Sequence, residues 1–384
     1  MPEKPLSSIP PQTRAVGLKL IIVGILAVVM WIPALFIYAL SYERSGRAES
    51  VKQEIYEREG GEQRVIGPFL IIPAIEQVKG YRSSGEEEGS VKPVRRTYAL
   101  MPKTLNGDID LKTDQRQRSI YTATTYEAAL SFSGAFDLST IEIAPNTELL
   151  WDEARLVVGL GSAQSLAGVR DAPQLSLNGI KQKTKFQPGY PILRGPADST
   201  PLQSGTGLSL PVKLMNNGGS MSFDLAMTLS GGGSFGFAPI GNETAITARS
   251  DWPHPGFQGQ IAPLNREISD NGFSAKWSTT SLSRPVPDSL LLDSDPGHSL
   301  SQQIAVVELL DPSSPYSKIN RSLKYALLFM GLIFLTVFVL EILFGSHAHP
   351  AQYILIGMAQ VLFFLMVLAL SEHMNFDMAF LVMS

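Results

Sequence analysis

Residues 231–236 read Gly-Gly-Gly-Ser-Phe-Gly and match the G-x-G-x-x-G spacing with which a backbone approaches a pyrophosphate. That chemistry requires a helix directly after the glycines, because the helix N-terminus faces the phosphate. Here Phe237, Ala238 and Pro239 follow, and another strand is expected beyond them. The segment therefore predicts a bend or bulge in a strand and no nucleotide site.

Histidine occurs at five positions, 254, 298, 347, 349 and 373, and no pair has the spacing of a zinc motif such as H-E-x-x-H. The chain contains no cysteine, which removes thiolate ligands, disulfides and a cysteine nucleophile. Residues 232–236 match the G-x-S-x-G spacing, but a nucleophile elbow also requires a helix directly after the serine, and a strand is expected here. We therefore predict no catalytic residue, no metal site and no cofactor. The sequence leaves enzymatic activity open and favours a non-enzymatic role.

The most unusual stretch away from the apolar runs is the loop at residues 250–257. Two prolines fix its backbone, and its aromatic side chains are large amphipathic surfaces of the kind found at interfaces. One interpretation is that Trp252 and Phe257 cap a β core while Asp251 holds the turn. The other is an interaction loop, made of Asp251, Trp252, Pro253, His254, Pro255 and Phe257.

Three ionisable residues lie at or near membrane depth, where charge is costly unless it is paired or functional. Glu341 is near the end of the second apolar run, and Glu372 and His373 follow the third. Chain reversal puts Glu341 at one membrane face and Glu372 at the other, so they form one site only with the help of other helices. Interfacial placement, helix packing and a polar pathway remain the alternatives.

The elements that position these residues begin with three apolar runs, 20–42, 325–344 and 351–370. At about 1.5 Å per residue each can cross a hydrocarbon core of roughly 30 Å as a helix. The first run is longer than the core of a signal peptide, which favours an uncleaved anchor over a cleaved leader. Residues 345–350 are a short turn, so the second and third spans are antiparallel neighbours. Residues 371–384 resemble a loop and the start of a further span, which predicts a truncated bundle.

The orientation of the chain is not decided by its charges. Lys318, Arg321 and Lys324 crowd the start of the second span, and the positive-inside rule alone would place the middle region in the cytoplasm. That rule is weak for flanks of long domains, which translocate largely regardless of charge. The net charge of −4, from 31 Lys and Arg against 35 Asp and Glu, argues against a nucleic-acid partner.

The middle region changes its apolar period. Residues 43–60 have helical spacing and predict a juxtamembrane extension of the first span, whereas residues 221–230 and 273–277 alternate as half-buried strands do. Turn-rich clusters separate the other strand candidates, which are residues 65–75, 119–126, 155–160, 208–214, 244–249 and 304–310. Residues 61–324 are therefore predicted to be one mostly antiparallel all-β domain, a sandwich or an open barrel.

Five segments together resemble the CreD family of bacterial inner-membrane proteins: GPFLIIP at 67–73, SDWPHP at 250–255, NGFSAKW at 271–277, HPAQY at 349–353 and LSEH at 370–373. The resemblance runs from the first span to the C-terminus. It implies an N-terminal anchor, a large periplasmic β-rich domain, a C-terminal membrane bundle and a role in envelope integrity under a two-component sensor and regulator. It supplies no catalytic residues.

The sequence thus predicts a multi-pass protein of the bacterial inner membrane with a cytoplasmic N-terminus at 1–19 and a large extracytoplasmic β domain between transmembrane helices. Its expected function is support of envelope integrity or of the envelope stress response, as a scaffold or sensor. Its expected partners are the lipid bilayer and an envelope protein or ligand of unknown identity, and its oligomeric state is open. The alternative is a transporter or membrane enzyme that uses Glu341, Glu372 and His373.

Overall fold

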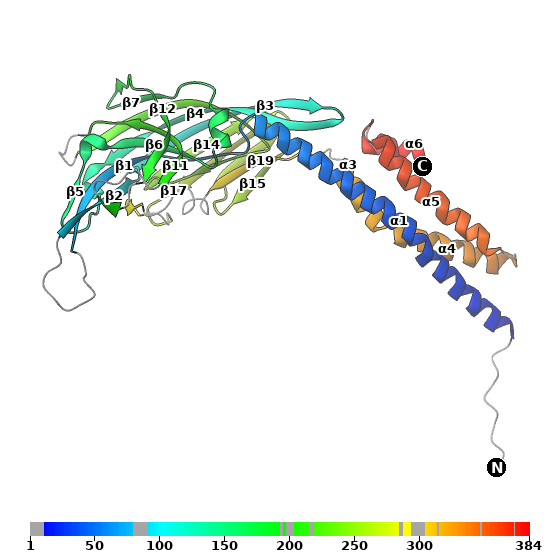
Figure 1. Cartoon of the computed structure of the whole chain (residues 1–384). Helices are drawn as coiled ribbons and strands as arrows, with labels where there is room; N and C mark the ends of the chain where they lie inside the picture. The colour runs from blue at the N-terminus through cyan, green and yellow to red at the C-terminus, as the bar shows by residue number, and fades with distance from the viewer. Residues whose placement is uncertain are drawn as a thin grey trace, which may run out of the picture. The chain divides into compact units, whose positions relative to one another are not determined.

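The computed structural model in Figure 1 describes residues 11–79, 91–192, 195–196, 203–214, 219–283, 287–292, 304–312, 315–345, 348–371 and 373–384. The chain divides into two compact units. The first, which we call the helical unit, consists of Met1–Val51 and Pro312–Ser384. The second, the β unit, is Lys52–Asp311.

Five α-helices are present among the described residues: α1 (Pro11–Arg58), α3 (Pro315–Lys324), α4 (Ala326–Phe344), α5 (Pro350–Ser371) and α6 (Phe376–Met383). Val16–Arg58 and Pro350–Ser371 are long and apolar enough to cross a membrane. A third span results if α3 and α4, which are bent by 44° at their break, are taken as one. Because α1 is continuous to Arg58, the expected juxtamembrane helix is the C-terminal part of the first helix.

One helix lies where the sequence predicted part of the β-rich region. α3 forms because Ile319 and Leu323, four residues apart, share a buried face, whereas Arg321 and Lys324 on the same short segment are exposed. Two buried apolar positions are too few to indicate a helical period from sequence. The β unit itself ends at Asp311.

The β unit contains two sheets. The 11-stranded sheet consists of β1 (Gln63–Lys79), β2 (Val91–Leu100), β5 (Thr147–Leu149), β6 (Arg155–Leu160), β9 (Gln187–Ile192), β10 (Gly195–Pro196), β11 (Gln203–Pro211), β13 (Ser234–Ala238), β15 (Pro255–Gly259), β18 (Ser289–Leu291) and β19 (Ala305–Leu309). The 8-stranded sheet consists of β3 (Thr104–Arg118), β4 (Tyr121–Asp137), β7 (Gln174–Leu177), β8 (Ile180–Lys181), β12 (Ser220–Gly232), β14 (Glu243–Ser250), β16 (Asn265–Ser269) and β17 (Gly272–Thr279). Short 3-10 helices lie at Leu138–Thr140, Trp151–Glu153 and Gln164–Gly168.

The pairing of these strands is mixed. Most neighbours are antiparallel, but β1 pairs with β13 and β3 pairs with β14 in parallel. The main path of the first sheet is β15-β19-β13-β1-β6-β11-β9, and that of the second is β16-β17-β14-β3-β4-β12-β7-β8. The prediction of apolar helices around a large β-rich domain is therefore confirmed, and the sheets are less purely antiparallel than expected.

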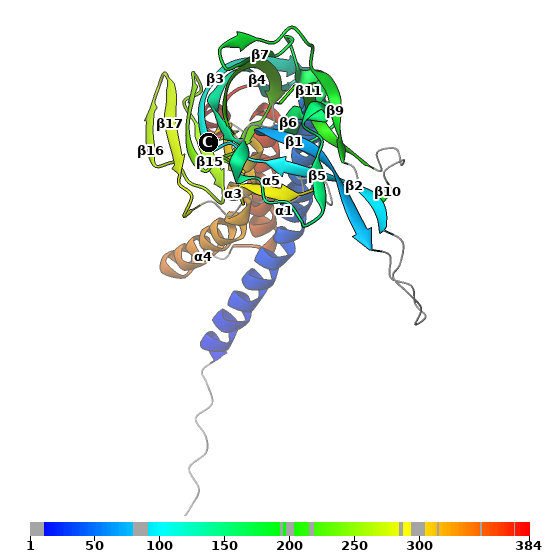
Figure 2. The same ribbon diagram turned by 90° about the vertical axis from the view of Figure 1, so that its left-hand side faces the viewer.

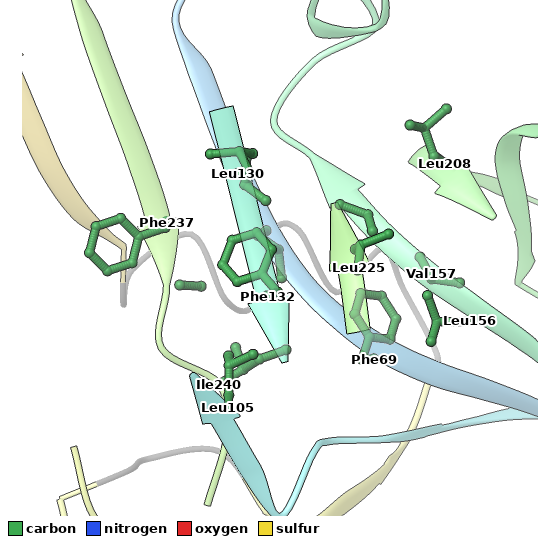
Figure 3. Packing of buried hydrophobic residues seen from close by; sticks show 14 of the residues in the cluster. Phe69, Leu105, Leu130, Phe132, Leu156, Val157, Leu208, Leu225, Phe237 and Ile240 are labelled. Atoms are coloured by element: carbon green, nitrogen blue, oxygen red, sulfur yellow. The ribbon is translucent and has the colours of Figure 1, made fainter. Parts of the chain in front are cut away.

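Both sheets contribute to one hydrophobic core. Figure 3 shows Phe69 of β1 and Phe132 of β4 among the side chains packed there, with Leu225 of β12 nearby. The predicted alternation holds in β12, where Phe223, Leu225 and Met227 are buried and the residues between them are exposed. The core is thus built from the inward-facing residues that the period of two identified.

The glycine-rich segment is the place where the chain passes from one sheet to the other. β12 of the 8-stranded sheet ends at Gly232, Gly233 has φ +73°, and β13 of the 11-stranded sheet begins at Ser234. A left-handed residue between two strands is a position that glycine fills without strain. The prediction of a strand bend is confirmed, and a strand instead of a helix follows it.

Candidate functional site

A set of buried polar contacts lies where α1 ends and β1 begins. We call this place the junction, and define it by Tyr56, Glu59, Gln63, Tyr126 and Gly233. The ring of Tyr56 lies against the glycine bend so closely that a Cβ on Gly232 would be 2.0 Å from its Cδ1 atom. The bend therefore requires glycine for space as well as for backbone conformation.

Gln63 is fully buried, and its amide joins three segments that are distant in sequence. Its Nε2 atom donates to the carbonyl oxygens of Gly60 at 3.1 Å, Ser165 at 3.3 Å and Ser230 at 2.8 Å. Ser230 in turn donates from its hydroxyl to the carbonyl of Glu59 at 2.7 Å. The end of α1 is thereby hydrogen-bonded to β12 and to the 3-10 helix at Gln164–Gly168.

Tyr126 extends these contacts into the first strand of the other sheet. Its buried hydroxyl donates to the carbonyl of Ser234 at 2.7 Å and accepts from the backbone N–H of Gln63 at 3.3 Å. Burial raises the pKa of the Tyr126 phenol above its ordinary value, because the phenolate would lose its hydration. The hydroxyl is therefore a neutral structural bridge and has no base to activate it.

Ion pairs surround the outer side of the junction. Glu59 pairs with Arg170 and, at 3.7 Å, with Arg116, and Glu54 on α1 pairs with Arg118. Arg116 and Arg118 belong to the β3–β4 hairpin, which extends past its neighbouring strands in Figure 1. These side chains are largely exposed, so each pair contributes little energy and mainly fixes orientation.

The chain leaves the β unit beside the place where it enters. Lys52 of α1 pairs with Asp311 at 3.5 Å, and the N–H of Leu309 donates to the carbonyl of Gly233 at 2.8 Å. The two ends of the β unit are therefore held together, and the glycine bend takes part in the second of these contacts.

The predicted interaction loop braces the same exit. Trp252 is half-buried, and its indole N–H donates to the carbonyl of Leu310 at 3.0 Å, while the N–H of Leu310 donates to the carbonyl of His254 at 3.1 Å. Asp251 accepts from the backbone and the hydroxyl of Thr113 at 3.0 and 2.8 Å.

The remaining loop residues divide between solvent and core. His254 is exposed and Pro253 is half-buried, and Pro255 begins β15. Phe257 packs edge-on against Phe273 and Trp277, with ring centroids 5.8 Å apart in both cases. These contacts account for the aromatic residues as braces of the β core, and binding of a partner by the loop stays a prediction.

In the helical unit, Glu341 is buried, and its side chain contacts residues outside its own helix α4. It pairs with Lys19 of α1, accepts from the backbone N–H of Ala348 at 2.9 Å, and accepts from the hydroxyl of Tyr353 at 3.2 Å. Tyr353 is itself buried, with its ring 5.4 Å from that of Phe334. This group, which we call the Glu341 cluster, closes the turn between α4 and α5 onto α1.

The structure does not bring His373 to this cluster. His373 is exposed and follows the C-terminal end of α5, whereas Tyr353 lies near its N-terminal end, and the helix of 22 residues separates them by about 30 Å. Glu372 lies outside the described residues. Sequence reasoning missed Lys19, although its position just before the first apolar run offered a partner for Glu341.

The described residues show no arrangement typical of catalysis or metal binding. They contain no group of three or more His, Asp or Glu side chains placed to hold a metal. A polar pocket of about 260 Å³ opens beside the junction, where Lys112, Arg116 and Arg170 face Glu59, Asp114 and Glu127. The three basic and three acidic side chains balance, so the pocket favours neither an anionic nor a cationic ligand.

The family model described as "Inner membrane protein CreD" matches residues 15–384, which is nearly the whole chain. The chain belongs to the CreD family. The inner membrane protein CreD of Escherichia coli (strain K12) is 29% identical over 357 residues, covering 92% of this chain and 75% of that protein. The sequence-based resemblance to this family is therefore confirmed, and membrane localisation follows from the family together with the apolar helices.

Among solved structures, the M1 zinc metallopeptidase of Deinococcus radiodurans shares 8% identity, over 54% of this chain and 42% of that chain, with a TM-score of 0.23. A likeness at this score carries no argument about fold or function. The CreD family membership rests on the sequence.

Proposed function

We propose that this CreD-family chain is a multi-pass inner-membrane protein that supports envelope integrity as a non-enzymatic scaffold or sensor. In this proposal the β unit lies in the periplasm, residues 1–19 lie in the cytoplasm, and a two-component sensor and regulator controls synthesis of the protein. Family membership and the apolar helices on both sides of the β unit in sequence support the proposal.

The observation that carries the proposal is the joining of the two ends of the β unit. A domain held at one end pivots about its tether, whereas a domain whose two ends are paired through Lys52 and Asp311 has its orientation restricted. Tyr56 and Glu54 of α1 contact the glycine bend and the β3–β4 hairpin, so a displacement of this end of the helix is passed to the strands. A scaffold or a sensor of envelope state needs this connection, and an enzyme does not.

Cysteine labelling tests the location of the β unit. The chain has no native cysteine, so a Leu282→Cys variant reports from a single position that is 98% exposed. We expect a membrane-impermeant maleimide to label it in intact cells with a permeabilised outer membrane. A Ser7→Cys variant, in the segment assigned to the cytoplasm, should react only after lysis. The reverse pattern would overturn the topology and the scaffold function with it.

Charge reversal tests whether the ion pair between Lys52 and Asp311 is needed for function. Lys52→Glu places like charges together at the paired ends, and Lys52→Glu with Asp311→Lys restores an opposite pair. In cells lacking the native gene, we expect the single variant to lose protection against a normally excluded dye at unchanged abundance, and the double variant to regain it. Lys103→Glu, which breaks a surface pair with Asp137 at 3.1 Å, is the matched control and should behave as the unaltered chain. Equal protection by all variants would contradict the role of the joined ends.

The alternative of a transporter or membrane enzyme centred on Glu341 is the weaker proposal. A transport carboxylate must change partners, and the Glu341 carboxylate is engaged by three groups from three segments. The contacts favour a helix clamp. A Glu341→Gln variant that is inactive at full abundance would favour the transporter instead.

A further inference from the structure

The outermost strand of the 8-stranded sheet, β16, is an unusual edge. All five of its residues are exposed, and among the described strands it pairs only with β17. Figure 2 shows it as the outermost strand on the left, beyond β17. In an antiparallel pair alternate residues turn their N–H and C=O groups away from the partner, so this edge presents backbone donors and acceptors that no other described strand pairs.

The core-facing side of β16 carries apolar surface that the other sheet does not cover. Ile268 is opposite the buried Phe273, which assigns it to the core face, and yet it is 51% exposed. Leu264, just before the strand, is 69% exposed and is fixed by its N–H to the carbonyl of Lys276. The covered part of the core ends one strand earlier, where Phe257 of β15 contacts Phe273. Apolar surface therefore continues past the end of the closed core.

Glu267 is the one charged residue on the outer side of the same strand, and Lys276 of β17 lies on this side opposite Asn265. Glu267 lies opposite Ser274, and the row continues through Arg249 to Asp110. A pocket of about 500 Å³ opens over this row, lined by Asp110, Asp251, Glu267 and Arg249 among others. Arg249 is already paired with Asp108 at 3.0 Å, so the charges left in the pocket are mainly carboxylates. A basic side chain complements this side.

We propose that β16 binds an extended segment of another polypeptide, which adds a strand to the sheet. Side chains of this segment alternate between apolar residues, which contact Ile268 and Leu264, and basic residues, which lie beside Glu267 and the acidic pocket. Main-chain hydrogen bonds to the free edge supply affinity, and the alternating contacts supply specificity. The inference rests on the proposed scaffold function, because it names the class of envelope partner that the β unit holds.

A second copy of this chain is a poor occupant of the edge. Two copies of β16 that pair about a two-fold axis perpendicular to the sheet must keep core-facing residues opposite core-facing residues. The central pairing then joins Arg266 to Arg266, Glu267 to Glu267 or Ile268 to Ile268, and the last of these brings two copies of Glu267 to diagonal positions. Like charges directly opposite each other destabilise a strand pair, and a charged residue on the core face of an edge strand is a known guard against self-association. The sequence of β16 therefore discourages self-pairing and leaves the edge to a different chain.

Peptide binding to the purified full-length chain in nanodiscs of zwitterionic lipid tests the proposal. The probe is a fluorescent peptide of about six residues that alternates valine with lysine, the length of a common strand. One comparison peptide alternates valine with glutamate, and another repeats the valine–lysine sequence with N-methyl groups along one backbone edge. Empty nanodiscs measure binding to lipid. We expect the unmodified valine–lysine peptide to bind at least about tenfold more tightly than either comparison peptide.

Variants assign any binding to β16. Ile268→Asp should weaken binding about tenfold or more, and Glu267→Lys should reverse the preference in favour of the valine–glutamate peptide. Ile180→Asp is the matched control, because Ile180 lies in β8 at the opposite edge of the same sheet and is 69% exposed. It should bind as the unaltered chain does.

The outcomes separate this inference from the scaffold function. Absence of peptide binding, equal binding of all peptides, or binding unaffected by Ile268→Asp would overturn the strand-addition proposal. Each of these results is compatible with a scaffold that holds its partner elsewhere. Loss of the scaffold function would instead appear in the labelling and charge-reversal experiments, which do not depend on β16.

Discussion

Replacing Gln63 with methionine is the sharpest test of the junction. The two side chains have similar volumes, so the substitution removes hydrogen bonds without opening a cavity. It takes the amide donor from the carbonyls of Gly60, Ser165 and Ser230 in a fully buried position. These carbonyls come from three segments, so the loss affects the end of α1 and the β unit together.

The magnitude follows from the contacts. The amide has two N–H bonds, so the three carbonyls share two full hydrogen bonds, and the loss of each bond costs about 1.5 kcal/mol. The Oε1 atom of Gln63 is buried with no hydrogen-bond partner among the described residues, and its removal returns about 1 kcal/mol. The net loss of stability is about 2 kcal/mol. For a unit of this size that corresponds to a fall of about 4–8 °C in melting temperature.

The assay is thermal unfolding of the detergent-purified chain, followed by tryptophan fluorescence. Three of the four tryptophans, Trp151, Trp252 and Trp277, lie in the β unit, so the signal reports mainly on it. Gln117→Met is the matched control, because Gln117 is exposed and its amide makes one bond, to the carbonyl of Ser119 at 3.0 Å. We expect the control to melt within about 1 °C of the unaltered chain. If Gln63→Met also melts within that range, the junction does not depend on this amide and the reasoning is wrong.

Three other contacts allow equally direct measurements. Tyr126→Phe should lower the free energy of unfolding by about 1–3 kcal/mol at neutral pH. Burial raises the pKa of Tyr126 in the folded chain above the unfolded value of about 10, so the stability difference between the unaltered chain and the variant should shrink as the pH rises past 10. Parallel pH–stability curves for the two proteins would contradict the assignment. Glu341→Gln should lower stability by about 1.5–3 kcal/mol and reduce abundance in membranes. The double variant with Lys19→Gln should lose less stability than the sum of the two single losses. Additive losses would show that the two residues do not interact. Trp252→Phe keeps an aromatic ring but removes the N–H that donates to the carbonyl of Leu310, so we expect the free energy of unfolding to fall by about 0.5–1.5 kcal/mol. An unchanged melting temperature would show that this hydrogen bond does not stabilise the β unit.

Much of the fold could be predicted because its signals are local. Apolar runs gave the membrane-type helices, and the alternation of Phe223, Leu225 and Met227 gave a half-buried strand whose inward residues form the core. Three consecutive glycines followed by strand residues gave the bend at Gly233, since only the immediate neighbours decide whether a helix follows. The family signature is local in the same sense, because short segments carry it in order.

The sequence was less informative where a signal was short or a partner was distant. α3 has only two buried apolar positions, Ile319 and Leu323, so its period could not be seen against the strand-rich region before it. The loop around Trp252 has a composition typical of an interface. In the fold, however, Trp252 donates a hydrogen bond to the carbonyl of Leu310, because the segment after β19 lies beside the loop. Composition predicts what a side chain can do, and its neighbours decide what it does.

By itself, the sequence determined the class of the protein: a member of a membrane family with apolar helices on both sides of a β-rich domain. Tertiary structure alone decided that Lys52 meets Asp311, that Gln63 reaches Ser230, and that Glu341 meets a lysine 322 positions away. Local periodicity fixes which face of an element is buried. Which elements meet depends on strand order, register and helix packing over the whole chain, and no window of neighbouring residues contains that information.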